Sequence, residues 1–333
     1  MKWVCILVSL ISLSLVTGCS KVKPAATQSH TQNSTLAPLG SLQQCQQYSG
    51  LPEAWQNSKT AGMVWIPEGS FQLGSNLAYP DELNFGQAQR QVTGFWIDQT
   101  EVTVAQFSSF VKATGYITDA EKQKQAAVFS PDANNPKQWW QLKADYTWKN
   151  PNGPAGKAPL PSEPVRYVTK NDAEHYAVWL GRDLPTEQEW EYAAKAGSKS
   201  DTPLHQAPQD THQHPQANYW QGEFPFDNTV EDHFQSVAPV GCYASNAFKL
   251  FDMIGNVWEW TSSAYHGAHD QHMGNYAELR QQNSTATQYV LKGGSFLCAS
   301  NFCARYRNSS RYPQEFDLAA THVGFRTILR TVE

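Results

Sequence analysis

Two long stretches without regular hydrophobic periodicity, residues 119–168 and 198–237, constrain the fold of this 333-residue chain most. Loops of this length inside a compact domain are uncommon, and bound ions are one way to order them. The composition agrees with a loop-rich fold, because 12% of the residues are aromatic, only 17% are charged, and Gly and Pro number 21 and 19. These values favour a loop-rich enzyme or lectin over a helical bundle.

Short regular elements are predicted between the irregular stretches. Residues 63–66 and 94–97 have the pattern of short strands bounded by Gly, Pro or Asp. Apolar spacing predicts helices over residues 103–113 and 172–180. A third helix is predicted to begin after Thr186, which can cap it, because the residue three positions on is a glutamate that can reach back. We therefore expect a mixed α+β domain with little regular secondary structure.

The N-terminus carries a long apolar run, residues 3–16, between Lys2 and a Gly-Cys pair. This arrangement predicts a secretory signal, residues 1–18, and the run is too short for a stable spanning helix. The ending LVTGC resembles the lipobox of bacterial lipoproteins, which implies acylation of Cys19; an ordinary signal with a chance cysteine is the alternative. Two or three acyl chains would hold the protein firmly on a membrane surface. A serine after the cysteine, Ser20, resembles the signal for sorting to the outer membrane. We therefore expect an envelope protein on the periplasmic face of the outer membrane.

Composition divides the rest of the chain into three parts. Residues 19–41 are mostly Ser, Thr, Gln, Ala and Pro, which predicts a flexible tether. Residues 42–61 contain scattered apolar residues and are predicted to form an extension that packs against the main domain, residues 62–331. The formal net charge of −5 argues against nucleic acid or an anionic membrane surface as the main partner. Contact with a membrane is therefore expected through the lipid anchor only.

Four cysteines remain after one leaves with the signal and one takes the lipid: Cys45, Cys242, Cys298 and Cys303. In an oxidising compartment they would by default form two disulfides. Cys298 and Cys303 stand five positions apart, so on a bent strand or turn they can face each other. As thiolates they would offer a soft, low-coordinate site of the type that selects Cu(I). On spacing alone, a plain disulfide is the favoured interpretation.

The residues around this pair resemble a known family. The segment GGSFLCASNFCARYR at residues 293–307, with GFR at 324–326, looks like the active-site segment of formylglycine-generating enzymes, also called sulfatase-modifying factors. The resemblance implies the loop-rich mixed fold of that family, within the C-type-lectin-like superfamily, over roughly residues 62–330. Five further blocks are similar to the family in the same order: GMVWIPEGSF at 62–71, FWID with EVT and QF at 95–107, LPTEQEWEYAA at 184–194, NYWQGEFP at 218–225 and GNVWEW at 255–260.

The resemblance implies that Cys298 and Cys303 bind Cu(I) and that O2 is the oxidant. The expected substrate is the cysteine of a Cys-x-Pro-x-Arg segment in an unfolded or exposed part of a sulfatase, which would become Cα-formylglycine. Ser295 and Trp258 match family residues beside the metal pocket, and Arg305 lies where the family has an arginine near the reacting centre. Packing or charge pairing is the alternative role for each of these three.

This chain departs from the family pattern at several positions. Phe302 stands where the family usually has Tyr, Ala299 replaces a His, and His322 occupies a position usually held by Asn. Residues 308–311 replace a stretch that is usually more apolar. These departures concern rate and substrate choice more than metal binding. They keep a second hypothesis open: a non-catalytic envelope lipoprotein that uses the same fold to bind a protein or polysaccharide partner.

The resemblance also implies two calcium sites, which would help to order the long loops because Ca²⁺ takes six to eight oxygen ligands. Solvated or capping carboxylates are the alternative. A run of three histidines, His266, His269 and His272, has a spacing that suits zinc but is interpreted as a polar loop. Cys45 and Cys242 are left over, and we expect them to form a disulfide that pins the N-terminal segment. The implied calcium ligands are Asn218, Tyr219 (carbonyl), Asp232 and Phe234 (carbonyl) in site 1, and Asp252, Gly255 and Val257 (carbonyls) and Glu259 in site 2.

Overall fold

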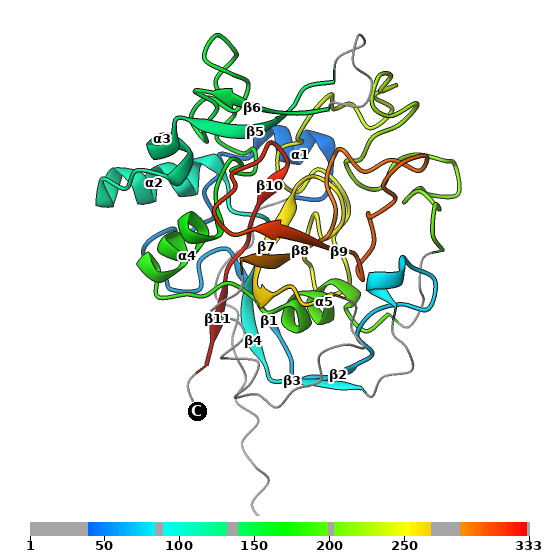
Figure 1. The fold of residues 1–333 in the computed structure, drawn as a ribbon. Helices are drawn as coiled ribbons and strands as arrows, with labels where there is room; N and C mark the ends of the chain where they lie inside the picture. The colour runs from blue at the N-terminus through cyan, green and yellow to red at the C-terminus, as the bar shows by residue number, and fades with distance from the viewer. Residues whose placement is uncertain (1–38, 84–88, 132–138, 199–202, 268–286, 332–333) are drawn as a thin grey trace, which may run out of the picture. The chain divides into compact units, whose positions relative to one another are not determined.

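A computed structural model describes residues 39–83, 89–131, 139–198, 203–267 and 287–331 (Figure 1). The expected signal peptide, Cys19 and nearly all of the tether lie outside these residues, as do His269 and His272. Those expectations therefore remain predictions. None of the helices in the described ranges is long and apolar enough to cross a membrane.

Two sheets and two hairpins make up the β structure. The strands are β1 (Met63–Ile66), β2 (Gly69–Phe71), β3 (Arg90–Val92), β4 (Phe95–Asp98), β5 (Gln125–Phe129), β6 (Trp140–Ala144), β7 (Trp258–Ala264), β8 (Gln288–Lys292), β9 (Arg311–Glu315), β10 (Val323–Gly324) and β11 (Ile328–Arg330). In the three-stranded sheet, β4 lies between β1 and β11 and is antiparallel to both. In the four-stranded sheet, β10 runs parallel to β7, and β8 and β9 follow as antiparallel neighbours. The hairpins are β2–β3 and β5–β6.

The helices begin at threonine or serine caps. They are α1 (Leu42–Gln47), α2 (Val104–Thr114), α3 (Asp119–Gln123), α4 (Lys170–Trp179) and α5 (Glu187–Lys195), with a short 3₁₀ turn, η1 (Pro80–Glu82). At α5, the Thr186 hydroxyl accepts from the Glu189 amide while the Glu189 carboxylate accepts from the Thr186 amide, which confirms the predicted capping box. The other two predicted helices correspond to α2 and α4. Helix α4 begins two residues before the predicted start, because Thr169 provides its cap.

One of the two stretches expected to be irregular contains regular structure. Residues 119–168 include α3 and the β5–β6 hairpin, in which Ala126 and Val128 point into the core from alternate positions. Strand β5 is only five residues long and contains two alanines, so its sequence shows little alternation between apolar and polar residues. The described part of residues 198–237 contains no helix or strand, as predicted.

The main core lies between α2, α4 and the C-terminal strands. The Phe107 ring packs against Phe110, Trp148, Tyr176 and Phe325, with ring centroids 5.2–6.4 Å apart. Helix α5 packs against β7 and β8 from below in Figure 1. The central strands are therefore held from two sides, and the loop that follows β8 leads to the site.

The N-terminal extension packs on the main domain as predicted. Cys45 and Cys242 form a disulfide, which confirms the expected pairing. The Gly50 carbonyl accepts a hydrogen bond from the Thr103 hydroxyl at 2.5 Å, at the cap of α2. The Arg182 guanidinium donates to the carbonyl of Lys59 at 2.8 Å. Residues 39–61 are therefore part of the folded domain.

Candidate active site

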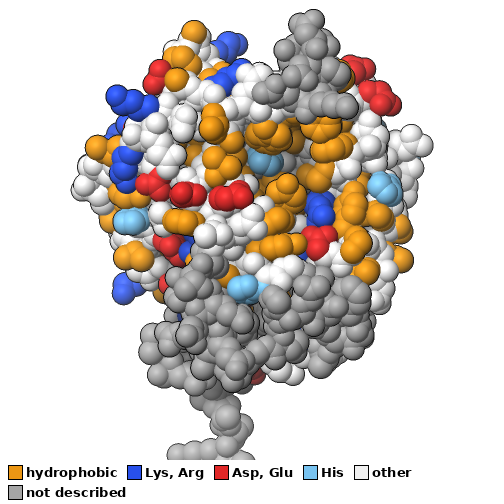
Figure 2. Space-filling view, in the orientation of Figure 1, with side chains coloured by type: hydrophobic (Ala, Val, Ile, Leu, Met, Phe, Trp, Pro, Cys, Tyr) orange, Lys and Arg blue, Asp and Glu red, His pale blue; other side chains and the backbone are white. Residues whose placement is uncertain are grey.

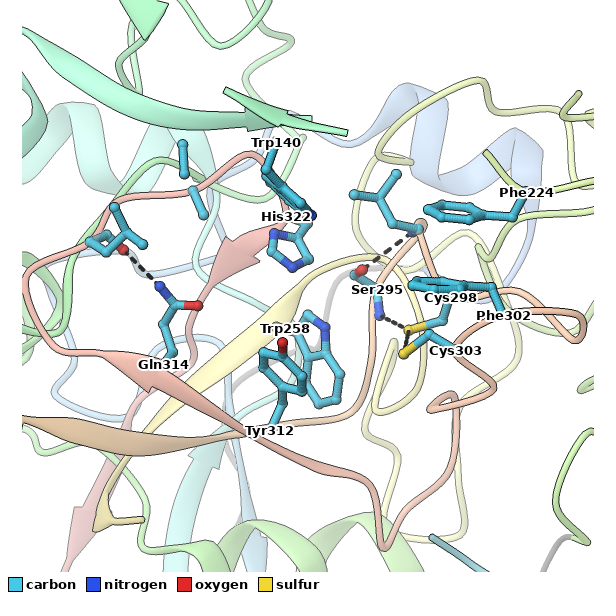
Figure 3. A pocket seen from close by; sticks show the side chains of 14 residues that line it. Trp140, Phe224, Trp258, Ser295, Cys298, Phe302, Cys303, Tyr312, Gln314 and His322 are labelled. Atoms are coloured by element: carbon cyan, nitrogen blue, oxygen red, sulfur yellow. Dashed lines mark hydrogen bonds between the residues drawn. The ribbon is translucent and has the colours of Figure 1, made fainter. Parts of the chain in front are cut away.

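A cavity of about 300 Å³ opens beside the four-stranded sheet and is walled mostly by apolar and aromatic side chains (Figure 3). Figure 2 shows apolar side chains gathered on this face of the molecule. The cavity is lined by Ala127, Trp140, Phe224, Trp258, Ser295, Leu297, Cys298, Phe302, Cys303, Tyr312, Gln314, Leu318, Ala320 and His322. Segments far apart in the sequence therefore meet at one concave apolar surface with a few polar groups, the usual form of a ligand site.

Two glycines shape the loop that carries both cysteines. Gly293 and Gly294 follow β8 with φ of +93° and +85°, a region that disfavours residues with a Cβ. A Cβ on Gly294 would lie 2.4 Å from the carbonyl oxygen of Arg305, so the loop also closes against its own later part. The Cys298 amide donates to the Ser295 carbonyl at 2.9 Å, which completes the turn.

The sulfurs of Cys298 and Cys303 lie 4.0 Å apart, and both are free. This separation is about twice that of a disulfide bond, at about 2.05 Å. Burial and the neighbouring sulfur raise the pKa of Cys298 above its usual range. The hydrogen bond from Cys298 lowers the pKa of Cys303, and the positive charge of Arg305 contributes to this shift. Cys303 is therefore the more readily ionised thiol of the pair, and Cys298 the less readily ionised one.

The two cysteines are expected to differ in reactivity. In the reduced, metal-free protein at pH 7, limiting iodoacetamide should alkylate Cys303 well before Cys298, because the thiolate is the nucleophile and Cys298 is only 2% exposed. Mass spectrometry of tryptic peptides, quenched at intervals, measures the order. Equal rates at the two positions would show that the thiols are not electrostatically distinct.

Arg305 does not line the cavity. Its guanidinium lies 3.0 Å from each oxygen of Asp81 and 2.7 Å from Glu82, so it fastens η1 to the loop of the cysteines. Arg305 lies near the cysteine pair, as the resemblance implies, but two carboxylates from a distant segment take its donors, which is the charge pairing given as its alternative role. Arg305 still acts on the site through its charge, which favours the Cys303 thiolate.

Ser295 and Trp258 line the cavity as predicted. The Ser295 amide donates to the sulfur of Cys298 at 3.4 Å, and the Ser295 hydroxyl accepts from the Leu297 amide at 3.3 Å. Trp258 begins β7, and its amide donates to the carbonyl of His322 at 2.9 Å. The structure therefore brings both residues to the cysteine pair.

Aromatic rings form the rim of the cavity. Phe302 is 50% exposed and stacks on Phe224, with ring centroids 4.7 Å apart and 6° between the planes. Trp139 meets both rings edge-on at 4.8 and 5.3 Å. The mouth of the cavity therefore offers flat apolar surfaces at which a peptide or another ligand can bury area.

The sequence does not single out eight residues of the lining, Phe224 among them. Three of the eight lie on β6 and β9: Trp140 on β6, and Tyr312 and Gln314 on β9. They reach the cavity only because β6 and β9 fold beside the cysteine loop. The tandem tryptophans at 139 and 140, in an otherwise polar stretch, are the one local signal that could have drawn attention to this wall.

In the first predicted calcium site, the ligand candidates lie close together. Asp232 accepts from the Tyr219 amide at 3.2 Å and from the Phe234 amide at 3.0 Å. The buried Oδ1 of Asn218 has no hydrogen-bond partner among the described residues. The Gln221 side-chain amide donates to the Tyr219 carbonyl and to Asp232. A buried carboxylate beside an unpartnered amide oxygen fits a hard cation.

In the second predicted site, Glu259 is already paired. Its two oxygens each lie 2.7 Å from the Arg326 guanidinium, and one also accepts from the Trp190 indole at 2.6 Å. Asp252 accepts from the Gly241 amide at 2.6 Å. A guanidinium therefore supplies the positive charge at Glu259 and takes both of its carboxylate oxygens.

This chain has relatives among proteins of known function and structure. The sequence signature described as "Sulfatase-modifying factor enzyme 1-like domain" matches residues 48–331, so the match starts within the N-terminal extension. A formylglycine-generating enzyme of Mycobacterium tuberculosis is 37% identical over 292 residues, covering 80% of this chain and 97% of that protein. A bovine protein named inactive C-alpha-formylglycine-generating enzyme 2 is 34% identical, covering 81% of this chain and 88% of that protein. The structure of PvdO from Pseudomonas aeruginosa superposes with a TM-score of 0.56 at 24% identity, covering 82% and 96% of the two chains.

Proposed function

Because this chain belongs to the family of sulfatase-modifying factor enzyme 1-like proteins, we propose that it is a formylglycine-generating oxidase. It would oxidise the cysteine of a Cys-x-Pro-x-Arg segment in a sulfatase to Cα-formylglycine, using O2. Active and inactive proteins are both found among relatives of similar identity, so the fold does not decide between them. The observation that carries the proposal is the pair of free cysteines at the cavity, Cys298 and Cys303, with sulfurs 4.0 Å apart.

The two sulfurs fit a soft metal ion. They are close enough to hold one ion between them and too far apart to be bonded to each other. Cys303 ionises more readily than an ordinary thiol, and thiolates select Cu(I) over harder ions. Copper, when bound there, would supply the one-electron and O2 chemistry that protein side chains lack.

The remaining lining residues would bind and orient the substrate. The Ser295 amide fixes the sulfur of Cys298, so the metal-holding pair keeps its geometry before any ligand binds. Trp258 and Tyr312 lie below the cavity with rings 5.9 Å apart and exclude water from one side. The Phe224–Phe302 stack lies at another side of the mouth, beside the two cysteines (Figure 3). A peptide cysteine entering this space would be desolvated beside the two sulfurs.

The direct test uses the soluble protein beginning after Cys19, prereduced and loaded with Cu(I). It is incubated in air with a peptide that carries Cys-x-Pro-x-Arg, and the product is identified by mass spectrometry with an aldehyde-trapping reagent. An aldehyde at the cysteine supports the oxidase. Peptide binding without an aldehyde, and without tight Cu(I) binding, would instead support the non-catalytic binding protein.

We also propose that the protein is a lipid-anchored component of the bacterial envelope. The LVTGC ending supports acylation at Cys19, and the Cys45–Cys242 disulfide suits an oxidising compartment. In the native host, Cys19→Ala should move the protein from the membrane fraction to the soluble fraction and abolish labelling by radioactive palmitate. Cys5→Ala is the matched control, because that cysteine would leave with the signal. Unchanged fractionation of Cys19→Ala would contradict the anchor.

Calcium is proposed for the first site only. With Ca²⁺ at about 100 times its dissociation constant, a specific site adds about 2.7 kcal/mol of stability, which should raise the Tm by about 5–10 °C. Asp232→Asn should remove most of this rise, since it removes the buried carboxylate. Asp227→Asn, an exposed aspartate in the same loop, should keep it. Differential scanning calorimetry with Ca²⁺ or with EDTA measures both, and a Ca²⁺ effect equal in the two variants would rule out this site.

A further inference from the structure

His322 places an imidazole in the cavity wall with no evident structural reason for being polar. Its ring lies against Trp140, with centroids 4.7 Å apart, and Figure 3 shows it between Trp140 and Trp258. The buried Nδ1 has no hydrogen-bond partner among the described residues. An unpartnered buried polar atom costs free energy and calls for an explanation. A leucine would fill the same space without this cost.

The backbone on both sides of His322 is firmly held. The His322 carbonyl accepts from the Trp258 amide at 2.9 Å, and the Thr321 amide donates to the Ala127 carbonyl at 3.0 Å. The Thr321 carbonyl accepts from Arg166 at 3.3 Å. The ring therefore sits in a preorganised position, and a ligand would not have to order it on binding.

The surroundings indicate which nitrogen carries the hydrogen. Burial lowers the pKa of His322 to about 3, so the ring is neutral at physiological pH and has one N–H. A buried N–H without an acceptor is rarer in proteins than an unpartnered lone pair. Nδ1 therefore carries the lone pair and Nε2 carries the hydrogen. Because Nδ1 is buried while the ring lines the cavity, Nε2 is the nitrogen that can meet a ligand there.

We propose that His322 is a substrate-binding residue whose Nε2–H donates a hydrogen bond to a backbone carbonyl of the peptide segment bound in the cavity. This inference rests on the proposed function only in taking a peptide as the ligand. A peptide carbonyl is the acceptor that fits best, because an extended segment lying in the cavity presents one at every residue. The contact therefore fixes the position of the segment rather than the identity of one side chain.

Binding measured without turnover tests the inference separately from the oxidase. The probe is a fluorescein-labelled peptide in which serine replaces the reacting cysteine, and fluorescence anisotropy with the metal-free protein gives its affinity. His322→Leu should weaken binding about tenfold, whereas His322→Gln, which keeps an amide N–H at a similar reach, should stay within about threefold of wild type. His205→Gln is the control. His205 is exposed, and its ring contacts the Ser300 carbonyl in the loop that carries the cysteines.

A second measurement changes the peptide and tests it against both the wild type and His322→Leu. Backbone esters placed one at a time along the peptide weaken a single carbonyl acceptor. One ester should lower affinity for the wild type and have no further effect on His322→Leu, which is the coupling expected of partners in one hydrogen bond. Equal binding by all variants, or independent effects of ester and substitution, would overturn the inference. If the wild type forms aldehyde while His322→Leu binds normally, the oxidase stands and this contact fails; if no peptide binds the wild type, both fail.

Discussion

Substituting Ser for Cys298 or for Cys303 is expected to lower aldehyde formation by at least about 10³-fold, with the fold retained. A hydroxyl is a harder ligand than a thiolate and is not ionised at neutral pH, so either substitution removes half of the soft site. The two sulfurs act as a unit, and the double variant should therefore be no less active than either single one. Serine is close in size to cysteine, so the Cys298 position stays packed.

Two readouts separate this effect from misfolding. Competition with a chromophoric Cu(I) chelator should show loss of tight binding in both single variants, and the Tm should change little. Ser300→Ala, an exposed position between the two cysteines, should retain both binding and turnover. Turnover by Cys303→Ser at a rate near that of the wild type would refute the assignment of the pair as the metal site.

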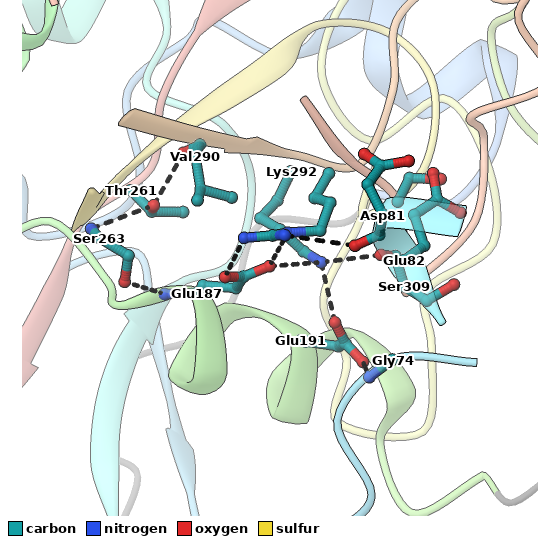
Figure 4. A network of polar contacts seen from close by, with 12 residues as sticks. Gly74, Asp81, Glu82, Glu187, Glu191, Thr261, Ser263, Val290, Lys292 and Ser309 are labelled. Carbon is teal, nitrogen blue, oxygen red and sulfur yellow. Dashed lines mark hydrogen bonds and ion pairs between the residues drawn. The ribbon is translucent and has the colours of Figure 1, made fainter. Parts of the chain in front are cut away.

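The largest expected effect on stability comes from Lys292→Met. The Lys292 ammonium is fully buried and lies 2.8 Å from Glu191, 3.8 Å from Glu187 and 3.1 Å from the Ser309 carbonyl (Figure 4). Removing the ammonium leaves Glu191 with Lys195 at 2.9 Å and Glu187 with Arg311 at 2.7 Å, so the cost is expected at about 3 kcal/mol, the lower end of the range for a broken buried pair. Lys292 directly precedes Gly293, so the loss should also loosen the loop that carries the cysteines.

Chemical denaturation of the soluble protein measures this cost as a lower midpoint at an unchanged slope. Lys122→Met is the matched control. Its partner is Asp119 at 3.0 Å, but the lysine side chain is 55% exposed, so the loss should be at most about 1 kcal/mol. Similar losses of unfolding free energy in the two variants would show that burial does not make the Lys292 ion pairs more important for stability than an exposed pair.

Local signals in the sequence were sufficient for several elements of the fold. A threonine followed three residues later by Glu or Gln marks the starts of α2 and α5, because the capping box is formed by neighbours in the chain. The Cys45–Cys242 pair followed from the cysteines left after the other assignments. The β5–β6 hairpin was not predicted, because only contacts with the rest of the protein bury one face of β5 and so stabilise it as a strand.

Only the part of the candidate site that lies on the cysteine loop was predictable from the sequence. Cys298, Cys303 and Ser295 lie within one motif, and their placement at the cavity agrees with it. The contacts of Arg305 and Glu259 depend on charges far away in the sequence. Arg305 pairs with Asp81, and Glu259 pairs with Arg326. Pairings of this kind join residues more than sixty positions apart, and no local pattern in the sequence encodes them.

The pairing of β11 with β4, and of β10 with β7, has a consequence for how the chain is made. Both sheets lack a strand until residues 323–330 have been synthesised. The earlier strands can pair with one another, β1 with β4 and β8 with both β7 and β9, but the places taken by β11 and β10 stay open until then. The two sheets are therefore completed late and together, by the single segment that carries β10 and β11.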